Sequence, residues 1–230
     1  MHINVLTLFP QMVEDALSYG VIGKAIEQGL VTVKCINPRD FAENKHQRVD
    51  DKPFGGGPGM VMMYDPLFRA LRSIGQTAET GPVLCMSPQG DTLCQHHCNE
   101  WAQLPQITLV CGRYEGIDQR FIEAHVDQEI SIGDYVISGG EMAACVVIDA
   151  TIRQLAGVLG DSESAETDSF MTGQLGMPQY TRSELLGQSG VPAVLLSGHH
   201  QAIDSWRQEQ AKQLTQHRRP DLLEGTSEGH

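Results

Sequence analysis

The sequence contains no long hydrophobic run and no segment of the kind that directs export. None of the apolar stretches in this chain of 230 residues approaches the ~20 residues that a membrane-spanning helix needs. The first nine residues lack a basic segment and a cleavage site, and they predict a β-strand rather than a signal peptide. We therefore expect a cytoplasmic protein without a membrane partner, whose six cysteines are reduced thiols.

Positive charge is also scarce. The chain has 16 Lys and Arg residues against 29 Asp and Glu residues, a net charge of -13, which argues against loose, nonspecific affinity for nucleic acid. The charge is unevenly distributed, however. Residues 113–168 contain 12 acidic residues and 3 arginines, whereas residues 205–220 contain four basic residues and one acidic residue. A nucleic-acid substrate is therefore not excluded, and the basic segment is where we expect it to bind.

Two glycine-rich stretches lack the spacing of nucleotide-binding loops. Residues 20–24 place two residues between the glycines where a phosphate loop requires four, and Ala25 follows the lysine. In residues 55–60, a dinucleotide fingerprint would need a third glycine at the position of Met60. Both nucleotide sites are therefore disfavoured. We expect residues 55–59 to be a backbone hinge or a surface that another chain approaches closely.

Signals for a hydrolase and for a zinc site are incomplete as well. The G-x-S-x-G motif of serine esterases is absent, and His199 and His200 have no Ser or Asp partner at a supporting spacing. Cys94 and Cys98 would share one face of a helix. A closed zinc site needs further ligands, typically from a second pair, and the sequence offers none. We therefore expect residues 94–98 to form a helix surface.

Strand and helix patterns alternate along most of the chain. Strands are predicted for residues 1–9, 30–36, 83–86, 107–111 and 126–132, and helices for residues 10–16, 22–28, 65–74, 92–102, 117–125, 139–159 and 202–215. In the third of these helices, Asp65 is the expected N-cap and Pro66 the first helical residue. This alternation predicts an α/β fold with a parallel sheet. The small, polar and acidic residues 161–167 predict a flexible linker between a first domain, residues 1–160, and a second domain, residues 168–230.

Glycine-containing loops follow three of the predicted strands, at residues 87–90, 111–116 and 131–140. Glycine lets a backbone adopt positive φ and approach a ligand closely. The carboxyl ends of parallel strands are where α/β proteins usually bind ligands. The three loops together therefore predict one ligand pocket at that edge of the sheet.

Several charged residues have a structural and a functional interpretation that the sequence alone does not separate. Arg153 lies within the predicted apolar helix 139–159, where it either reaches the surface or meets a functional partner. Asp168, at the junction of linker and second domain, is either an N-cap or a functional carboxylate. Glu115 and Asp118 follow the second glycine loop, where a capping role is equally available.

The motifs, in their order and spacing, resemble those of the bacterial tRNA (guanine-N1)-methyltransferases of the TrmD type, which belong to the SPOUT superfamily. The resemblance covers essentially the whole chain and rests on residues 54–60, 87–90, 111–118, 131–141, 157–160, 168–170, 180–182 and 197–199. It implies a parallel α/β sheet with a deep trefoil knot that binds S-adenosylmethionine, a small and mostly helical C-terminal domain that binds tRNA, and a homodimer with a shared active site. The strand pattern by itself predicts an open, unknotted sheet.

The resemblance also implies roles for individual residues. Asp168 matches the general base and Arg153 the residue that supports the target guanine, in transfer of a methyl group to N1 of guanosine 37 of tRNA. Mg²⁺ is implied as an activator, without an assigned metal ligand. The expected cofactor-binding residues are Pro88, Gln89, Gly112, Tyr114, Glu115, Ile132, Gly133, Asp134, Tyr135, Val136, Ile137, Gly139 and Gly140. The expected tRNA-binding residues are Arg113, Arg182, His199, Arg207, Arg218 and Arg219.

Three departures from the family pattern concern the pocket and the second domain. Met142 and Ala143 stand where Leu-Pro is expected, Cys85 where a tyrosine is common, and Ser183 where proline usually follows Thr-Arg. None of them removes a group with a proposed chemical role. The alternatives to tRNA guanine-N1 methylation are a related SPOUT methyltransferase that acts on another RNA base and an RNA-binding protein without catalysis. A phosphate-loop hydrolase is opposed by the glycine spacing.

Overall fold

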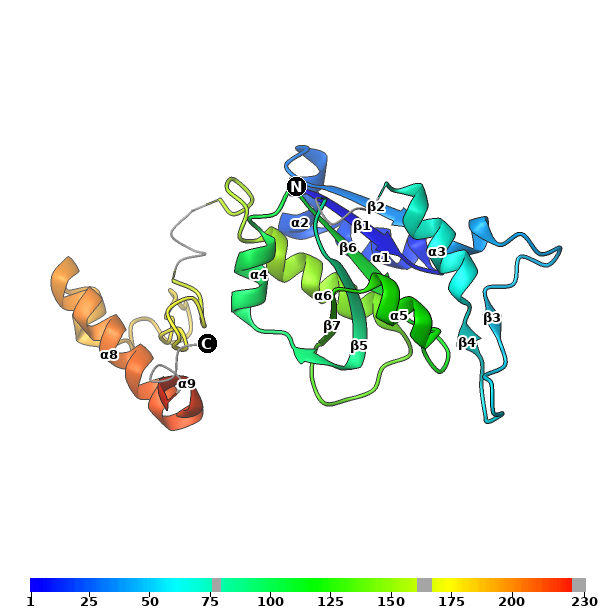
Figure 1. Cartoon of the computed structure of the whole chain (residues 1–230). Helices are drawn as coiled ribbons and strands as arrows, with labels where there is room; N and C mark the ends of the chain where they lie inside the picture. The colour runs from blue at the N-terminus through cyan, green and yellow to red at the C-terminus, as the bar shows by residue number, and fades with distance from the viewer. Residues whose placement is uncertain (76–79, 161–166, 225–230) are drawn as a thin grey trace. The chain divides into compact units, whose positions relative to one another are not determined.

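The computed structural model describes residues 1–75, 80–160 and 167–224 (Figure 1). The chain forms two compact units, residues 1–160 and residues 161–230. The first unit contains a parallel sheet with helices on both faces. The described part of the second unit consists of helices, turns and irregular segments. The predicted linker falls almost entirely on residues 161–166, which lie outside the described residues.

The sheet of the first unit has five strands in the order β2-β1-β6-β5-β7. All neighbouring strands pair in parallel, as the sequence predicted. Of the three inner strands, β1 and β6 are almost entirely buried, in accordance with their nearly continuous apolar sequences, and β5 is buried over its first four residues. The strands are β1 (His2–Leu6), β2 (Thr32–Ile36), β5 (Val83–Thr92), β6 (Gln106–Cys111) and β7 (Gln128–Ser131).

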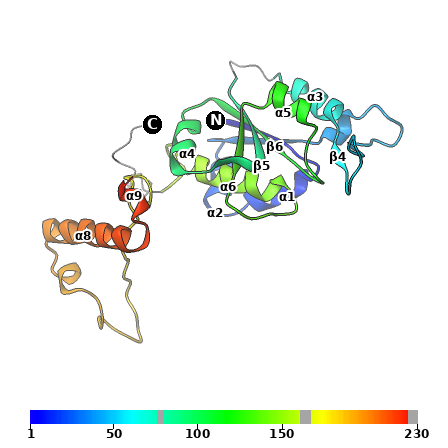
Figure 2. The same cartoon turned by 60° about the horizontal axis from the view of Figure 1, so that its bottom comes forward.

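Helices cover both faces of the sheet. One hydrophobic cluster joins the strands to α1 (Pro10–Leu17), α2 (Gly20–Glu27), α4 (Gln95–Trp101) and α6 (Gly140–Ile152). A second cluster joins the other face to α3 (Tyr64–Ser73), α5 (Gln119–His125) and the short 3-10 helix η1 (Pro38–Phe41). Figure 2 shows α3 and α5 on one side of the sheet and α1, α2 and α6 on the other. The core therefore consists of two apolar layers separated by the sheet.

A small hairpin projects from the sheet, formed by β3 (Asp50–Asp51) and β4 (Val61–Met62) (Figure 1). Its tip contains the glycine-rich residues 55–59. Four of these glycines have positive φ, from 76° to 124°, a conformation that disfavours any other residue. Phe54 at the tip is 97% exposed. Both predictions for residues 55–59, a backbone hinge and a surface that another chain approaches closely, remain predictions.

Several predicted boundaries are wrong. Helix α3 begins at Tyr64 with Met63 as its N-cap, so Asp65 lies in the first turn and does not cap the helix. Strand β5 continues to Thr92 rather than ending at Met86, because its last residues pair with β7. Helix α6 ends at Ile152 rather than at residue 159. The residues after it form turns that include Gly157 at a φ of 82°.

The cysteine-rich segment forms the start of α4. Cys94 is the exposed N-cap of this helix, and its backbone N–H donates to Nδ1 of His97 at 3.3 Å. Cys98 is buried in the contact of α4 with α6, so the prediction of a helix surface is wrong for this residue. Cys85 and Cys111 are buried in the sheet and Cys35 and Cys145 are half-buried, as expected for small apolar side chains.

The described part of the second unit is built around the long helix α8 (His200–Arg218), which confirms and extends the predicted helix 202–215. The 3-10 helix η2 (Ala193–Leu196) precedes it and the short α9 (Asp221–Glu224) follows it. His199 is the N-cap of α8, and its Nδ1 accepts a hydrogen bond from the N–H of Ala202 at 3.3 Å. Across the ranges that the structure describes, no helix is both long and apolar enough to span a membrane.

Candidate active site

Residues 87–90, predicted as a loop, instead lie within β5, where the pairing register with β7 shifts between Met86 and Asp91. A cavity of about 430 Å³ lies beside residues 85–89 of β5 and at the carboxyl ends of β6 and β7, where the loops 111–116 and 131–140 line it. The sequence therefore located this pocket correctly. Twelve of the thirteen residues expected to bind a cofactor line it, and Asp134 is not among the lining residues. The twelve are Pro88, Gln89, Gly112, Tyr114, Glu115, Ile132, Gly133, Tyr135, Val136, Ile137, Gly139 and Gly140. Their contact with a cofactor remains a prediction.

Two of the loops touch at Gly140, the first residue of α6. The N–H of Gly140 donates to the carbonyl oxygen of Gly112 at 2.9 Å. A Cβ atom at position 140 would lie 2.8 Å from the backbone Cα of Cys111, closer than real Cβ atoms come. Only glycine therefore lets α6 begin at this point. Gly90 likewise allows β5 and β7 to approach each other closely, because a Cβ atom at position 90 would overlap the backbone of Glu129.

A buried ion pair holds the base of the pocket. The carboxylate of Glu141 is 0% exposed and accepts from Nε of Arg113 at 2.8 Å and from Oγ1 of Thr7 at 2.8 Å. Nη1 of Arg113 also donates to the carbonyl oxygen of Ser138 at 3.1 Å, and its guanidinium lies 4.4 Å from the ring centroid of Phe9. These bonds satisfy a carboxylate whose burial would otherwise be costly. They join the end of β1, the second loop and the third loop into one support.

The same network explains why Arg113 is poorly accessible. Its side chain is 18% exposed, and its described donors point to groups inside the first unit. The sequence grouped Arg113 with the tRNA-binding residues, and that contact stays a prediction. Burial raises the pKa of the Cys111 thiol well above its ordinary value, and the negative charge of the nearby Glu141 carboxylate adds to this rise.

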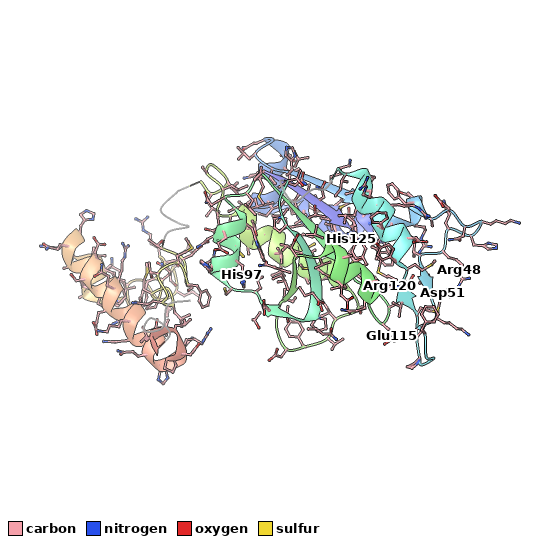
Figure 3. The ribbon with its side chains drawn as sticks, viewed as in Figure 1. Arg48, Asp51, His97, Glu115, Arg120 and His125 are labelled. Atoms are coloured by element: carbon pink, nitrogen blue, oxygen red, sulfur yellow. The ribbon has the colours of Figure 1, made fainter. Side chains whose placement is uncertain are left out.

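The second loop is also attached to the β3-β4 hairpin. The N–H of Glu115 donates to the carbonyl oxygen of Met60 at 2.9 Å, and the N–H of Met62 donates to that of Gly116 at 2.9 Å. The Glu115 side chain, which is labelled in Figure 3, lies against Gly59, where a Cβ atom would overlap it. The glycine-rich hairpin and the rim of the pocket therefore form a continuous structure.

Asp118 is the N-cap of α5, which confirms the structural one of its two interpretations. Its side chain accepts from the N–H of Arg120 at 3.0 Å at the start of α5 and pairs with the Arg120 guanidinium at 2.6 Å. The hydrogen bond from Arg120 lowers the pKa of Asp118 below its ordinary value. Glu115 does not cap α5, because it lies three residues before the N-cap, in the loop that lines the pocket.

The two residues with expected catalytic roles lie in different units. Arg153 is half-buried at the C-cap of α6 in the first unit, not inside a longer helix. Asp168 is exposed in the second unit, and its carbonyl oxygen accepts from the N–H of Met171 at 3.3 Å. The described residues after Asp168 form turns rather than a helix, so the alternative of an N-cap is not supported.

A family model described as tRNA (Guanine-1)-methyltransferase TrmD matches residues 1–225 of this sequence. The chain belongs to the TrmD family. Proteins named tRNA (guanine-N(1)-)-methyltransferase from Halorhodospira halophila, Methylococcus capsulatus and Haemophilus influenzae are 52%, 53% and 51% identical to it. These matches cover 97–98% of this chain and 85–92% of the relatives. The resemblance drawn from the motifs is thereby confirmed.

The tRNA-binding residues expected for this TrmD-family chain remain predictions, but the structure shows their exposure and their ion pairs. Arg182, His199, Arg207, Arg218 and Arg219 are all exposed in the second unit. Arg207 pairs with Asp204 at 3.4 Å, and Arg219 pairs with Asp221 at 2.6 Å. The residues of the second unit therefore present several positive side chains to solvent.

Sequence reasoning missed several residues that line the pocket of this TrmD-family chain. Ile117 and Ile130 line it and were not expected to, whereas Cys85 and Ala143, two departures from the family pattern that were associated with the pocket, do line it. For Ile117 and Ile130, their position next to the glycine loops was the available signal. The partnership of Thr7 with Glu141 was missed because the two residues lie 134 positions apart. Nothing local in the sequence marks such a pair.

Proposed function

We propose that this protein transfers a methyl group from S-adenosylmethionine to N1 of guanosine 37 in tRNA. The observation that carries the proposal is that one pocket gathers the loops predicted to bind the methyl donor, in a chain matched by the TrmD family model over residues 1–225. Membership in a methyltransferase family implies a methyl donor. S-adenosylmethionine as that donor and guanosine 37 as the target are proposals.

The pocket suits a nucleoside-containing donor. A cavity of about 430 Å³ lies within the range of roughly 300–1,000 Å³ usual for small-molecule sites. Its lining combines glycine backbone at Gly112, Gly139 and Gly140 with the apolar side chains of Ile132 and Ile137. Glycines let a nucleobase or ribose approach the backbone closely. The bound sulfonium would supply a methyl group that needs little activation, so alignment provides much of the remaining rate.

The residues of the chain would handle the proton and the developing charge. N1 of guanine carries a proton, and the Asp168 carboxylate would accept it, a contribution of roughly 100- to 10,000-fold. Loss of that proton moves negative charge toward O6 of the base, where the Arg153 guanidinium would stabilise it. The target base must leave its stack to reach the pocket. Residues 168–230 would bind the tRNA through their exposed arginines.

A homodimer is proposed as well, and exposed apolar side chains of the first unit support it. Helices α1 and α6 pack against each other. Between them they expose Met12, Met142 and Val146, and Val136 in the third loop is 88% exposed. Neighbouring apolar side chains at a surface are typical of an interface between subunits. The trefoil knot also remains a proposal, supported by the close packing of the second and third loops at Gly140.

Mg²⁺ is proposed only as an activator that is bound together with substrate. Among the residues that the structure describes, no three His, Cys, Asp or Glu side chains gather at one point. Mg²⁺ commonly keeps several waters and uses one or two carboxylates together with ligand oxygens, so a preformed cage is not required. Acting on tRNA, the protein would work in the cytoplasm.

The test is to incubate the protein with S-adenosylmethionine and a tRNA transcript that carries guanosine 37, and to map the modified base. Methyl at N1 of guanosine 37, lost in Asp168→Ala, is the expected result. Methyl on another base would favour a related SPOUT methyltransferase. No transfer in the presence of bound donor would favour an RNA-binding protein without catalysis, and unchanged transfer by Asp168→Ala would refute the base assignment.

A further inference from the structure

The segment that carries Asp168 is a closed turn within the second unit. We use the name Asp168 turn for residues 167–176. The N–H of Phe170 donates to the carbonyl oxygen of Gln174 at 2.7 Å, and the N–H of Gly176 donates to Oγ of Ser169 at 2.8 Å. Phe170 has a φ of 75°, in the region that only glycine adopts freely, so the surrounding bonds must hold it there.

A side chain of α8 holds the far side of this turn. Oγ1 of Thr215 accepts from the N–H of Leu175 at 2.9 Å and donates to the carbonyl oxygen of Ala211 at 2.7 Å. A bond from a helical threonine to the carbonyl four residues earlier is a common local arrangement. The bond to Leu175 is different, because it spans 40 positions of the sequence and satisfies a backbone N–H outside the helix.

Burial shows that this contact belongs to the core of the second unit. Thr215 is 0% exposed and is the one buried residue of α8 among its 19 residues. Leu175 stands between Gln174 and Gly176, which are bonded to Phe170 and Ser169. Nearby, the Arg219 guanidinium lies 5.9 Å from the ring centroid of Phe170. The hydroxyl of Thr215 therefore fixes the segment 174–176, which is bonded to Phe170 and to Ser169, the residue that follows Asp168.

We propose that Thr215 is a positioning residue for Asp168, which it holds through the Leu175 N–H and the closed Asp168 turn. The proposal rests on the role of Asp168 as general base that is proposed above. A base must lie within hydrogen-bond reach of the proton it removes. A misplacement of about 1 Å can lower a rate by about 100-fold, so a residue that contacts no substrate can still control the chemical step.

The test compares Thr215→Val, which keeps the shape but lacks the hydroxyl, with Thr215→Ser, which keeps the hydroxyl. Single-turnover methyl transfer at saturating S-adenosylmethionine and tRNA should fall about 10- to 100-fold in Thr215→Val. It should return to near the wild-type rate in Thr215→Ser. The dissociation constant for tRNA should stay within about twofold, because no tRNA contact is removed. Ser183→Ala is the matched control, since it removes a similar bond to the Leu186 N–H in a separate turn of the same unit.

A double-mutant cycle shows whether Thr215 acts through Asp168. In an Asp168→Asn background, Thr215→Val should cause no further loss of rate. A full additional loss there, or an unchanged rate in Thr215→Val alone while Asp168→Asn is impaired, would overturn the role of Thr215 only. A fully active Asp168→Asn enzyme would instead overturn the base assignment and the role of Thr215 together. Hydrogen exchange adds a measurement without any variant: fast exchange of the Leu175 amide in the wild-type protein would refute the attachment.

Discussion

Arg113 and Glu141 form an ion pair of 2.8 Å whose carboxylate is completely buried at the base of the pocket. The pair joins the loop after β6 to the first turn of α6, and Thr7 adds a third element, the end of β1. Glu141 therefore organises the pocket without lining it. The fold and the proposed methyl-donor site consequently share one electrostatic support.

Replacing Arg113 with methionine should destabilise the protein strongly. Arg113→Met leaves the Glu141 carboxylate buried with Thr7 as its one remaining described side-chain donor. Breaking a buried pair in this way typically costs about 3–5 kcal/mol in the free energy of unfolding. Urea denaturation measures the change. Arg120→Met is the control, because it breaks an exposed pair with Asp118 and should shift the midpoint little. Similar shifts for both variants would contradict the support assigned to Arg113.

Adding one methyl group at Gly140 should disrupt the pocket. In Gly140→Ala the new Cβ would lie 2.8 Å from the backbone of Cys111, so the second and third loops must separate. We expect the protein to lose about 1–3 kcal/mol of stability and to bind S-adenosylmethionine more weakly in calorimetry. At Gly160 an added Cβ meets nothing within 4 Å, so Gly160→Ala should leave both quantities nearly unchanged. Normal donor binding by Gly140→Ala would show that the loops need not touch.

Alkaline pH should destabilise the protein through its buried thiols. Burial, aided by Glu129, raises the pKa of Cys85 to about 12, whereas an unfolded thiol titrates near 8.5. Between these values the unfolded chain binds fewer protons than the folded one, so stability is full below about pH 8.5 and is lost as the pH rises toward 12.

The measurement for this prediction is the slope of unfolding free energy against pH above about 8.5. Cys85→Ala should make the slope shallower, although the variant starts from a lower stability because a buried side chain is shortened. Cys94→Ala removes an exposed thiol and should keep the wild-type slope. If the slopes of Cys85→Ala and wild type coincide, other groups cause the alkaline loss.

The sequence predicted the parallel sheet and the pocket because both depend on local patterns. Apolar runs identified β1 and β6, and glycines identified the loops after β6 and β7, whereas the predicted loop 87–90 is part of β5. The end of α6 was misjudged because Leu155 and Val158 pack on the core after the helix has ended at Ile152. Apolar residues indicate burial, and they do not distinguish a helix from a packed turn.

Other features depend on contacts between distant residues and could not be predicted from the chain. The last residues of β5 are polar and largely exposed, and their strand conformation comes from pairing with β7, as in Thr92 with Ser131. Pro66 suggested the wrong first residue for α3 because proline is tolerated throughout the first turn, where backbone N–H groups lack helical partners. The bonds of Glu141 to Thr7 and of Thr215 to Leu175 likewise leave no local signal.

The salt dependence of tRNA binding should reveal few phosphate contacts, because the chain carries a net charge of -13. If contacts are confined to a few arginines of the second unit, the slope of log affinity against log salt should be no steeper than about -8. Arg219→Gln should make this slope shallower by about one unit and weaken binding equally for tRNAs of different sequence. Arg120→Gln, which removes an exposed arginine of the first unit, should leave the slope unchanged. A slope that is insensitive to Arg219 but changes in Arg120→Gln would move the RNA-binding surface to the first unit.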